Sequence, residues 1–113
     1  NKILIIGSNG KLSENDSSLK ELPYIFGNPE ISEFINFKKV IEESKISYDR
    51  VKNLYFFKSK RWDIELKNNV LIKLSRNNLE ETLDNVFEIL EDTNFRNIKT
   101  IDARIKNQII LNG

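Results

Sequence analysis

The chain has 113 residues and a mass of 13.3 kDa, which is enough for one ordinary domain and too little for two independent cores. It contains no cysteine and no histidine, which excludes disulfides, thiolate nucleophiles and the commonest metal ligands and general bases. The net charge of +1 favours neither nucleic acid nor another charged partner. With 39% hydrophobic and 31% charged residues and no apolar run of about 18 residues, the composition is typical of a globular domain without a membrane span.

The first part of the chain opens on a short β-branched run. Residues 3–6 predict a strand, residues 7–10 a turn, and the polar residues 11–20 a surface loop. Residues 22–27 are apolar and are expected to be extended and to pack on the core. Because Pro23 lacks the N–H that a central strand would use, we do not expect this stretch to lie inside a sheet.

Two segments have the apolar period of amphipathic helices. The first is expected over residues 29–45, with Asn28 as its N-cap and a proline at the first helical position. The second is expected to begin at Leu79, with Asn78 as its N-cap and Glu81 completing a variant of the capping box. The apolar stripes consist of Ile31, Phe34, Ile35, Phe37, Val40 and Ile41 in the first helix, and Leu79, Leu83, Val86, Phe87 and Leu90 in the second.

Five further runs predict strands, at residues 51–58, 61–66, 70–74, 98–105 and 108–111. In the second run Trp62, Ile64 and Leu66 alternate with charged residues and are expected to face the core, and the asparagines at 68 and 69 predict a tight hairpin after it. This order of strands and helices predicts a single α+β domain over residues 1–113. Two amphipathic helices are expected to pack on a mostly antiparallel sheet.

No catalytic, cofactor-binding or metal-binding residue is predicted. Six carboxylates crowd the second helix, but most lie opposite its apolar stripe, where a solvated charged face is expected: Glu80, Glu81, Asp84, Glu88, Glu91 and Asp92. The glycine-containing residues 7–10 follow a strand, but no Lys-Ser/Thr pair and no helix follow them, so a turn is favoured over a phosphate-binding loop.

The segment from Tyr55 to Trp62 interleaves aromatic rings with basic side chains, as proteins that bind single-stranded nucleic acid do. Against this interpretation, alternation directs Trp62 to the expected core face, and the domain is not basic overall. A small RNA-binding domain that uses this segment is therefore the alternative function.

The terminal run of residues 108–111 carries no charge and no proline. Proteins usually protect a terminal strand that is left open at a sheet edge. An unprotected strand is either internal to the sheet or reserved for a partner that adds a strand. The sequence leaves both interpretations open.

Several segments, in chain order, resemble the C-terminal β domain of the FtsQ/DivIB family. Residues 22–27 (LPYIFG) are similar to its L-P-apolar-apolar-G segment, residues 62–69 (WDIELKNN) to its Trp hairpin, and residues 101–105 (IDARI) to its apolar-D-x-R strand. The opening residues 3–11 and the segment 74–78 before the second helix also resemble their counterparts. Departures are Gly7 for a frequent Asp, Asn69 for the hairpin Gly, and Ile105 for a Tyr.

The resemblance implies a non-catalytic domain of a bitopic cell-division protein, without a cofactor. It implies a POTRA domain and one transmembrane helix upstream, and a location in the periplasm, at the inner membrane of the division septum. The absence of methionine and the apolar opening agree with a fragment of a longer chain. The implied partners are bitopic proteins of the FtsB/DivIC and FtsL types, which the domain would link to other division proteins as a scaffold.

The resemblance also implies where the partner binds. The implied contacts are Lys60, Arg61, Arg104, Ile105, Lys106, Asn107, Gln108, Ile109, Ile110 and Leu111. The last strand would pair with a strand of the partner, while Lys60 and Arg61 would pair with an acidic partner helix. For these two residues ordinary surface charge is the alternative. Asp102 shares a strand face with Arg104 and would be structural if it binds that side chain.

Overall fold

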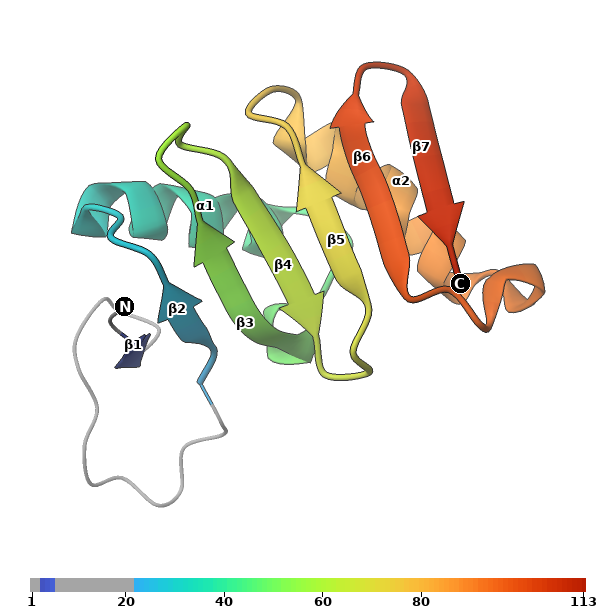
Figure 1. The fold of residues 1–113 in the computed structure, drawn as a ribbon, viewed down its shortest axis with the longest axis horizontal. Helices are drawn as coiled ribbons and strands as arrows, with labels where there is room; N and C mark the ends of the chain where they lie inside the picture. Colours follow the sequence, from blue (N-terminus) through green and yellow to red (C-terminus); the bar gives the residue numbers. More distant parts are fainter. Residues whose placement is uncertain (1–2, 6–21) are drawn as a thin grey trace.

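The computed structural model describes residues 3–5 and 22–113, which form one sheet covered by helices (Figure 1). The elements, in chain order, are β1 (Ile3–Ile5), β2 (Tyr24–Phe26), α1 (Ile31–Glu43), η1 (Tyr48–Arg50), β3 (Val51–Phe56), β4 (Trp62–Leu66), β5 (Leu71–Leu74), α2 (Leu79–Glu91), η2 (Thr93–Phe95), β6 (Thr100–Ile105) and β7 (Gln108–Asn112). Within the described residues the sheet has seven strands, and they lie in the same order as in the chain. The turn predicted at 7–10 and the loop predicted at 11–20 lie outside the described residues. None of the described helices is long and apolar enough to cross a membrane.

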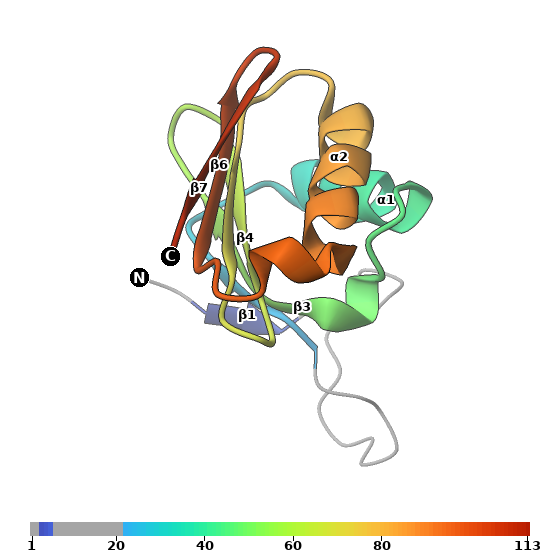
Figure 2. The same ribbon diagram turned by 90° about the vertical axis from the view of Figure 1, so that its right-hand side faces the viewer.

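The sheet is mixed, with two parallel pairs among antiparallel ones. Strands β2 and β3 are parallel, as are β5 and β6, while the four other neighbouring pairs are antiparallel. Parallel neighbours need a crossover connection, and α1 and α2 supply these two crossovers. Both helices lie on the same face of the sheet, and none of the described residues forms a helix on the other face (Figure 2). The α+β prediction is therefore confirmed, with a sheet that is mostly but not wholly antiparallel.

The core lies between the two helices and the sheet. Trp62 of β4 is 6% exposed and stacks on Phe37 of α1, with ring centroids 4.6 Å apart and planes 5° from parallel. Burying a large apolar side chain of this kind contributes roughly 1.5–3 kcal/mol. The predicted alternation of β4 is confirmed, because Ile64 and Leu66 are buried on the same face as Trp62. The apolar faces predicted for the helices are confirmed at their centres by buried Phe34 and Leu83, but Ile31 and Ile35 of the predicted α1 stripe are exposed.

The prediction that residues 22–27 lie outside the sheet is wrong. Strand β2 pairs with both β1 and β3, and its central residue Ile25 is fully buried. Pro23 does not prevent this because it precedes the first strand residue, Tyr24, and no ladder hydrogen bond from its nitrogen is needed there.

The starts of both helices differ from their predictions. Helix α1 begins at Ile31 with Glu30 as its N-cap, rather than Asn28, and a reciprocal capping box joins Glu30 to Glu33. For α2 the N-cap is Asn78 as predicted, but its backbone is left-handed (φ 52°) and its side chain caps nothing. The capping box with Glu81 is therefore absent, and Asn78 serves the turn instead, since asparagine tolerates this conformation.

Candidate protein-interaction edge

Strand β7 lies at one edge of the sheet that the described residues form. Among the described strands it pairs with β6 alone, so within this part of the chain it is not an internal strand. Ile109 and Leu111 are half-buried and pack against the core, whereas Gln108, Ile110 and Asn112 are exposed. Alternate residues of such a strand direct their N–H and C=O groups away from the sheet. The edge thus offers unpaired backbone groups together with apolar side chains on both faces.

A bulge next to this edge explains the pair Asp102 and Arg104. Asp102 is opposite Ile110, but Ile105 is opposite Gln108, so β6 contains one extra residue between them. Asp102 Oδ1 accepts the backbone N–H of Arg104 at 3.1 Å and its Nε–H at 2.9 Å, and Arg104 Nη2 donates to Asp102 Oδ2 at 2.7 Å. These hydrogen bonds lower the pKa of Asp102. Arg104 therefore stabilises the bulge and is committed to an internal partner.

Arg61 is likewise engaged within the domain. Its guanidinium pairs with Asp63, donates to the carbonyl of Leu74 at 3.1 Å and lies 4.5 Å from the centre of the Phe57 ring. Asp63 is 5% exposed, so burial raises its pKa while Arg61 opposes that shift. Removing Arg61 would leave a buried carboxylate without its cation. Through these contacts Arg61 connects the β3–β4 hairpin to β5.

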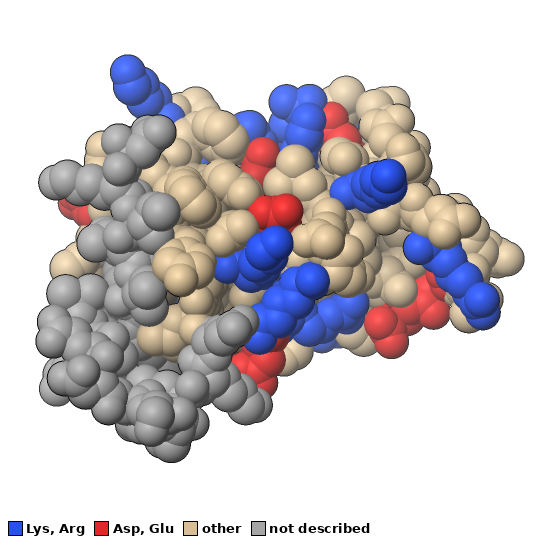
Figure 3. All heavy atoms as spheres, turned by 60° about the horizontal axis from the view of Figure 1, so that its bottom comes forward, with Lys and Arg blue, Asp and Glu red and all other residues tan. Residues whose placement is uncertain are grey.

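The helix-free face of the sheet does not form a platform for bases. Tyr55 lies on this face, stacks on Phe26 at 5.1 Å and donates its hydroxyl hydrogen to Glu65 at 2.7 Å. Trp62 and Phe56 turn to the opposite face, where their ring centroids are 4.8 Å apart. The aromatic rings of this segment are thus divided between two faces. In the view of Figure 3 several basic side chains adjoin one another near the middle, and acidic side chains lie above and beside them.

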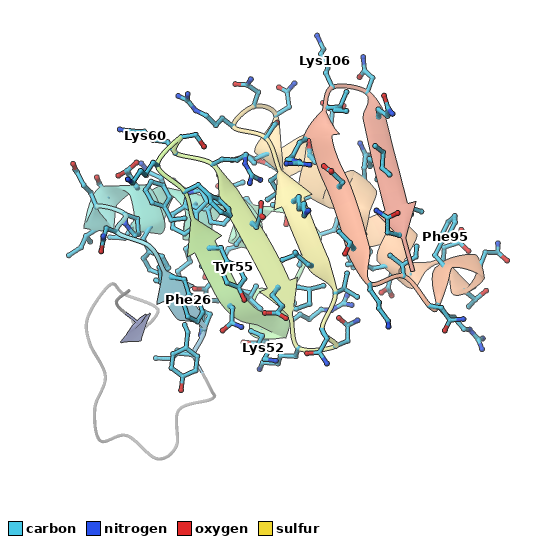
Figure 4. The ribbon with its side chains drawn as sticks, in the orientation of Figure 1. Phe26, Lys52, Tyr55, Lys60, Phe95 and Lys106 are labelled. Carbon is cyan, nitrogen blue, oxygen red and sulfur yellow. The ribbon has the colours of Figure 1, made fainter. Side chains whose placement is uncertain are left out.

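Lys60, Arg104 and Lys106 are the exposed basic side chains of the predicted site, and of these Arg104 is paired with Asp102. Each of the two lysines lies in a hairpin turn at the same end of the sheet, Lys60 between β3 and β4 and Lys106 between β6 and β7 (Figure 4). Lys60 itself has a positive φ of 66°, which the sequence did not predict, while the turn at Lys106 uses Asn107 with φ 61°. Lys60 Nζ lies 3.9 Å from Glu33 Oε2, a long and weak pair in which the lysine is exposed and the glutamate half-buried. Three strand spacings separate the two turns, or roughly 14 Å, so one partner could contact both.

A groove lies beside the edge on the helix-covered side. It has a volume of about 680 Å³, and the start of α2 and the β6–β7 hairpin form its walls. The helix contributes polar groups, including Asn78, Glu81 and Asn85, and the strands contribute Ala103 and Ile109. Sequence reasoning missed this groove because it arises from the packing angle between a helix and a hairpin that are apart in the chain. The polar first turns of α2 were the available signal.

The carboxylates of α2 do not converge on a site. Asp84 accepts the backbone N–H of Lys45 at 2.8 Å, Glu88 lies 3.8 Å from the Lys45 ammonium, and Glu91 pairs with Arg50 at 3.5 Å. These three carboxylates bind the connection between α1 and β3 to α2. In the part of the chain that the structure describes, no group of three or more acidic residues could hold a metal ion.

Comparison with known proteins gives one family. The family model described as "Cell division protein FtsQ/DivIB, C-terminal" matches residues 1–104. The match includes β1 and extends into β6, and it ends before β7. No curated protein matches the chain.

Proposed function

Since this chain belongs to the FtsQ/DivIB family of cell-division proteins, whose C-terminal domain matches most of its length, we propose that it binds a bitopic division protein through the β7 edge. The family implies a scaffold role in cell division. The finer proposal is that the partner is of the FtsB/DivIC type, accompanied by one of the FtsL type. The domain holds these proteins in place and catalyses no reaction.

The observation that carries the proposal is the unprotected β7 edge. An extended segment of the partner adds to β7 as an eighth strand, and its backbone pairs with the outward N–H and C=O groups. Each hydrogen bond contributes about 0.5–1.5 kcal/mol net. Side chains supply the specificity: Ile109 and Leu111 favour apolar partner residues on the helix-covered face, and Ile110 favours one on the other face.

The two accessible lysines support an acidic partner. Lys60 and Lys106 lie at the same end of the sheet, so an acidic helix joined to the added strand could contact both turns. Arg61 and Arg104, which are also proposed as contacts, hold the hairpin and the bulge in shape. In this proposal their replacement weakens binding by way of the fold as well.

The proposal includes the position of the domain in a longer protein. We place it in the periplasm, at the inner membrane of the division septum, after a POTRA domain and one transmembrane helix. Family membership supports a division-site membrane protein. The number of spans and the orientation are tested by sequencing the parent gene and by tagging its two ends.

The test is an NMR titration of this domain with a peptide that covers the extracytoplasmic segment of the same organism's FtsB-type protein. We expect amide shifts at residues 104–111 and near Lys60. Lys60→Glu and Lys106→Glu should each weaken binding about two- to fivefold. Lys39→Glu makes the same charge change on an exposed face of α1 and should not weaken it. Shifts that avoid β7, or equal effects of the three variants, would refute the proposed site.

A further inference from the structure

Exposed apolar side chains gather around the β7 edge. Ile105 is 52% exposed, Phe95 39% and Ile110 38%. Ile105 and Ile110 belong to β6 and β7, and Phe95 lies beside the lower end of β7 (Figure 4). Three of the seven large hydrophobic residues that are exposed in the described structure are therefore found at this edge.

The sequence of β7 fits a second copy of itself. If two β7 strands pair antiparallel with Ile110 opposite Ile110, all five residues of each strand, Gln108–Asn112, have a partner. Gln108 is then opposite Asn112, and Ile109 is opposite Leu111. Every cross-strand pair is amide with amide or apolar with apolar, and no like charges face each other. In each of these pairs the two side chains lie on the same face of the sheet. This follows because side chains alternate between the faces along a strand and the paired positions differ by even numbers.

The surroundings of β7 fit the same arrangement. Figures 1 and 2 show that η2 projects beyond β7 at the lower end of the sheet, on the helix-covered side. The groove beside the edge lies on that same side but at the upper end, under the β6–β7 hairpin. An antiparallel two-fold brings the lower end of one copy to the upper end of the other. The projecting η2, with Phe95, is thereby brought to the groove of the second copy, against Ile109, and this contact occurs twice.

The charges of α2 do not oppose such a pairing. Asp84, Glu88 and Glu91 are directed to Lys45 and Arg50, in the connection after α1. Glu81 is the acidic residue of α2 that lines the groove, and Lys106 in the opposite wall of the same groove carries the compensating charge.

We propose that a second copy of this chain occupies the β7 edge when the partner is absent, through antiparallel β7–β7 pairing centred on Ile110 and a Phe95 of each copy in the groove of the other. Self-pairing stands on the structure alone. The consequence that the dimer closes the edge to a division protein rests on the proposed function.

The experiment is sedimentation velocity of residues 1–113 from micromolar to millimolar concentration, without and with the partner peptide. The wild-type domain should form a dimer as its concentration rises. Ile110→Lys and Ile110→Glu should each weaken self-association about tenfold or more, because like charges then face each other. An equimolar mixture of these two variants should recover the dimer. Phe95→Ser should weaken it, and Ile35→Lys, which adds a charge at an exposed isoleucine of α1, should not.

Amide spectra of each variant establish that it is folded. A wild-type domain that stays monomeric would overturn the proposal, as would a dimer that persists in both Ile110 variants or a mixture that fails to recover. The peptide should dissociate the dimer. A peptide that binds the intact dimer would overturn the inference that the dimer closes the β7 edge to the partner. A dimer that does not bind the peptide would refute the proposed function and leave self-pairing standing. A domain that binds the peptide but stays monomeric at every concentration would refute self-pairing and leave the proposed function standing.

Discussion

Gly27 lies where the backbones of β2 and β3 approach each other so closely that no side chain fits. It follows β2, has a φ of +103°, and lies against the end of β3. A Cβ placed on it would be 2.3 Å from the carbonyl oxygen of Phe56 and 3.2 Å from the carbonyl carbon. Both neighbouring groups are backbone, and Phe56 also packs on Trp62 in the core. The overlap cannot be relieved by turning a side chain.

We therefore predict that Gly27→Ala is strongly destabilising. The positive φ costs a residue with a Cβ about 1–2 kcal/mol. Displacing the packed backbone of β3 costs about 1–3 kcal/mol more, as for an overfilled core. The sum, about 2–5 kcal/mol, is a large part of the 5–15 kcal/mol that typically stabilises a domain. For a domain of this size it corresponds to a fall in melting temperature of roughly 10–20 °C.

Thermal unfolding followed by circular dichroism measures this effect. Asn28→Ala changes the adjacent exposed residue and should alter the free energy of unfolding by less than about 0.5 kcal/mol. If Gly27→Ala melts within about 2 °C of the wild-type domain, the close approach of β2 and β3 described here is incorrect.

Three further predictions concern the core and the bulge. Trp62→Ala should cost about 3–5 kcal/mol in urea unfolding, because it empties the space stacked on Phe37, and a cost under about 1 kcal/mol would contradict the core assignment. The buried hydroxyl of Tyr48 has no hydrogen-bond partner among the described residues, so Tyr48→Phe should leave stability unchanged or raise it by about 1 kcal/mol; a clear loss would reveal a missed partner. The pKa of Asp102 is lowered, so its contribution is present above about pH 4 and is lost as the pH falls through the folded-state pKa. Asp102→Asn should reduce the loss of stability that the wild-type domain shows on acidification, and identical pH profiles would count against the Arg104 pairing.

Local sequence patterns were sufficient to predict those elements whose structure depends on their own segment alone. The alternation around Trp62 predicted the buried face of β4, because a strand with one face in the core requires a period of two. Asn69 was predicted in a tight turn, and its φ of 69° confirms a conformation that asparagine tolerates. The terminal run without charges predicted a strand that nothing protects.

Other features depended on what surrounds a segment. Pro23 was a reason to exclude a central strand at residues 22–27. In the structure the pairing of β2 with β3 begins one residue later, at Tyr24, so no N–H from Pro23 is needed. Arg61 looks like any surface cation in the sequence, and its pairing with Asp63 is known only from the folded strands. The pairing of Arg104 with Asp102, in contrast, could be expected from the strand face that the two residues share.

The sequence by itself determined the class of the domain, its two amphipathic helices, its Trp-centred core and an unprotected last strand, because these follow from periods and residue types within short segments. The tertiary structure decided that this strand is an edge, which basic side chains remain accessible beside it, and that a groove and a projecting aromatic ring flank it. Those properties arise from distances between segments far apart in the chain, and a local pattern does not contain them.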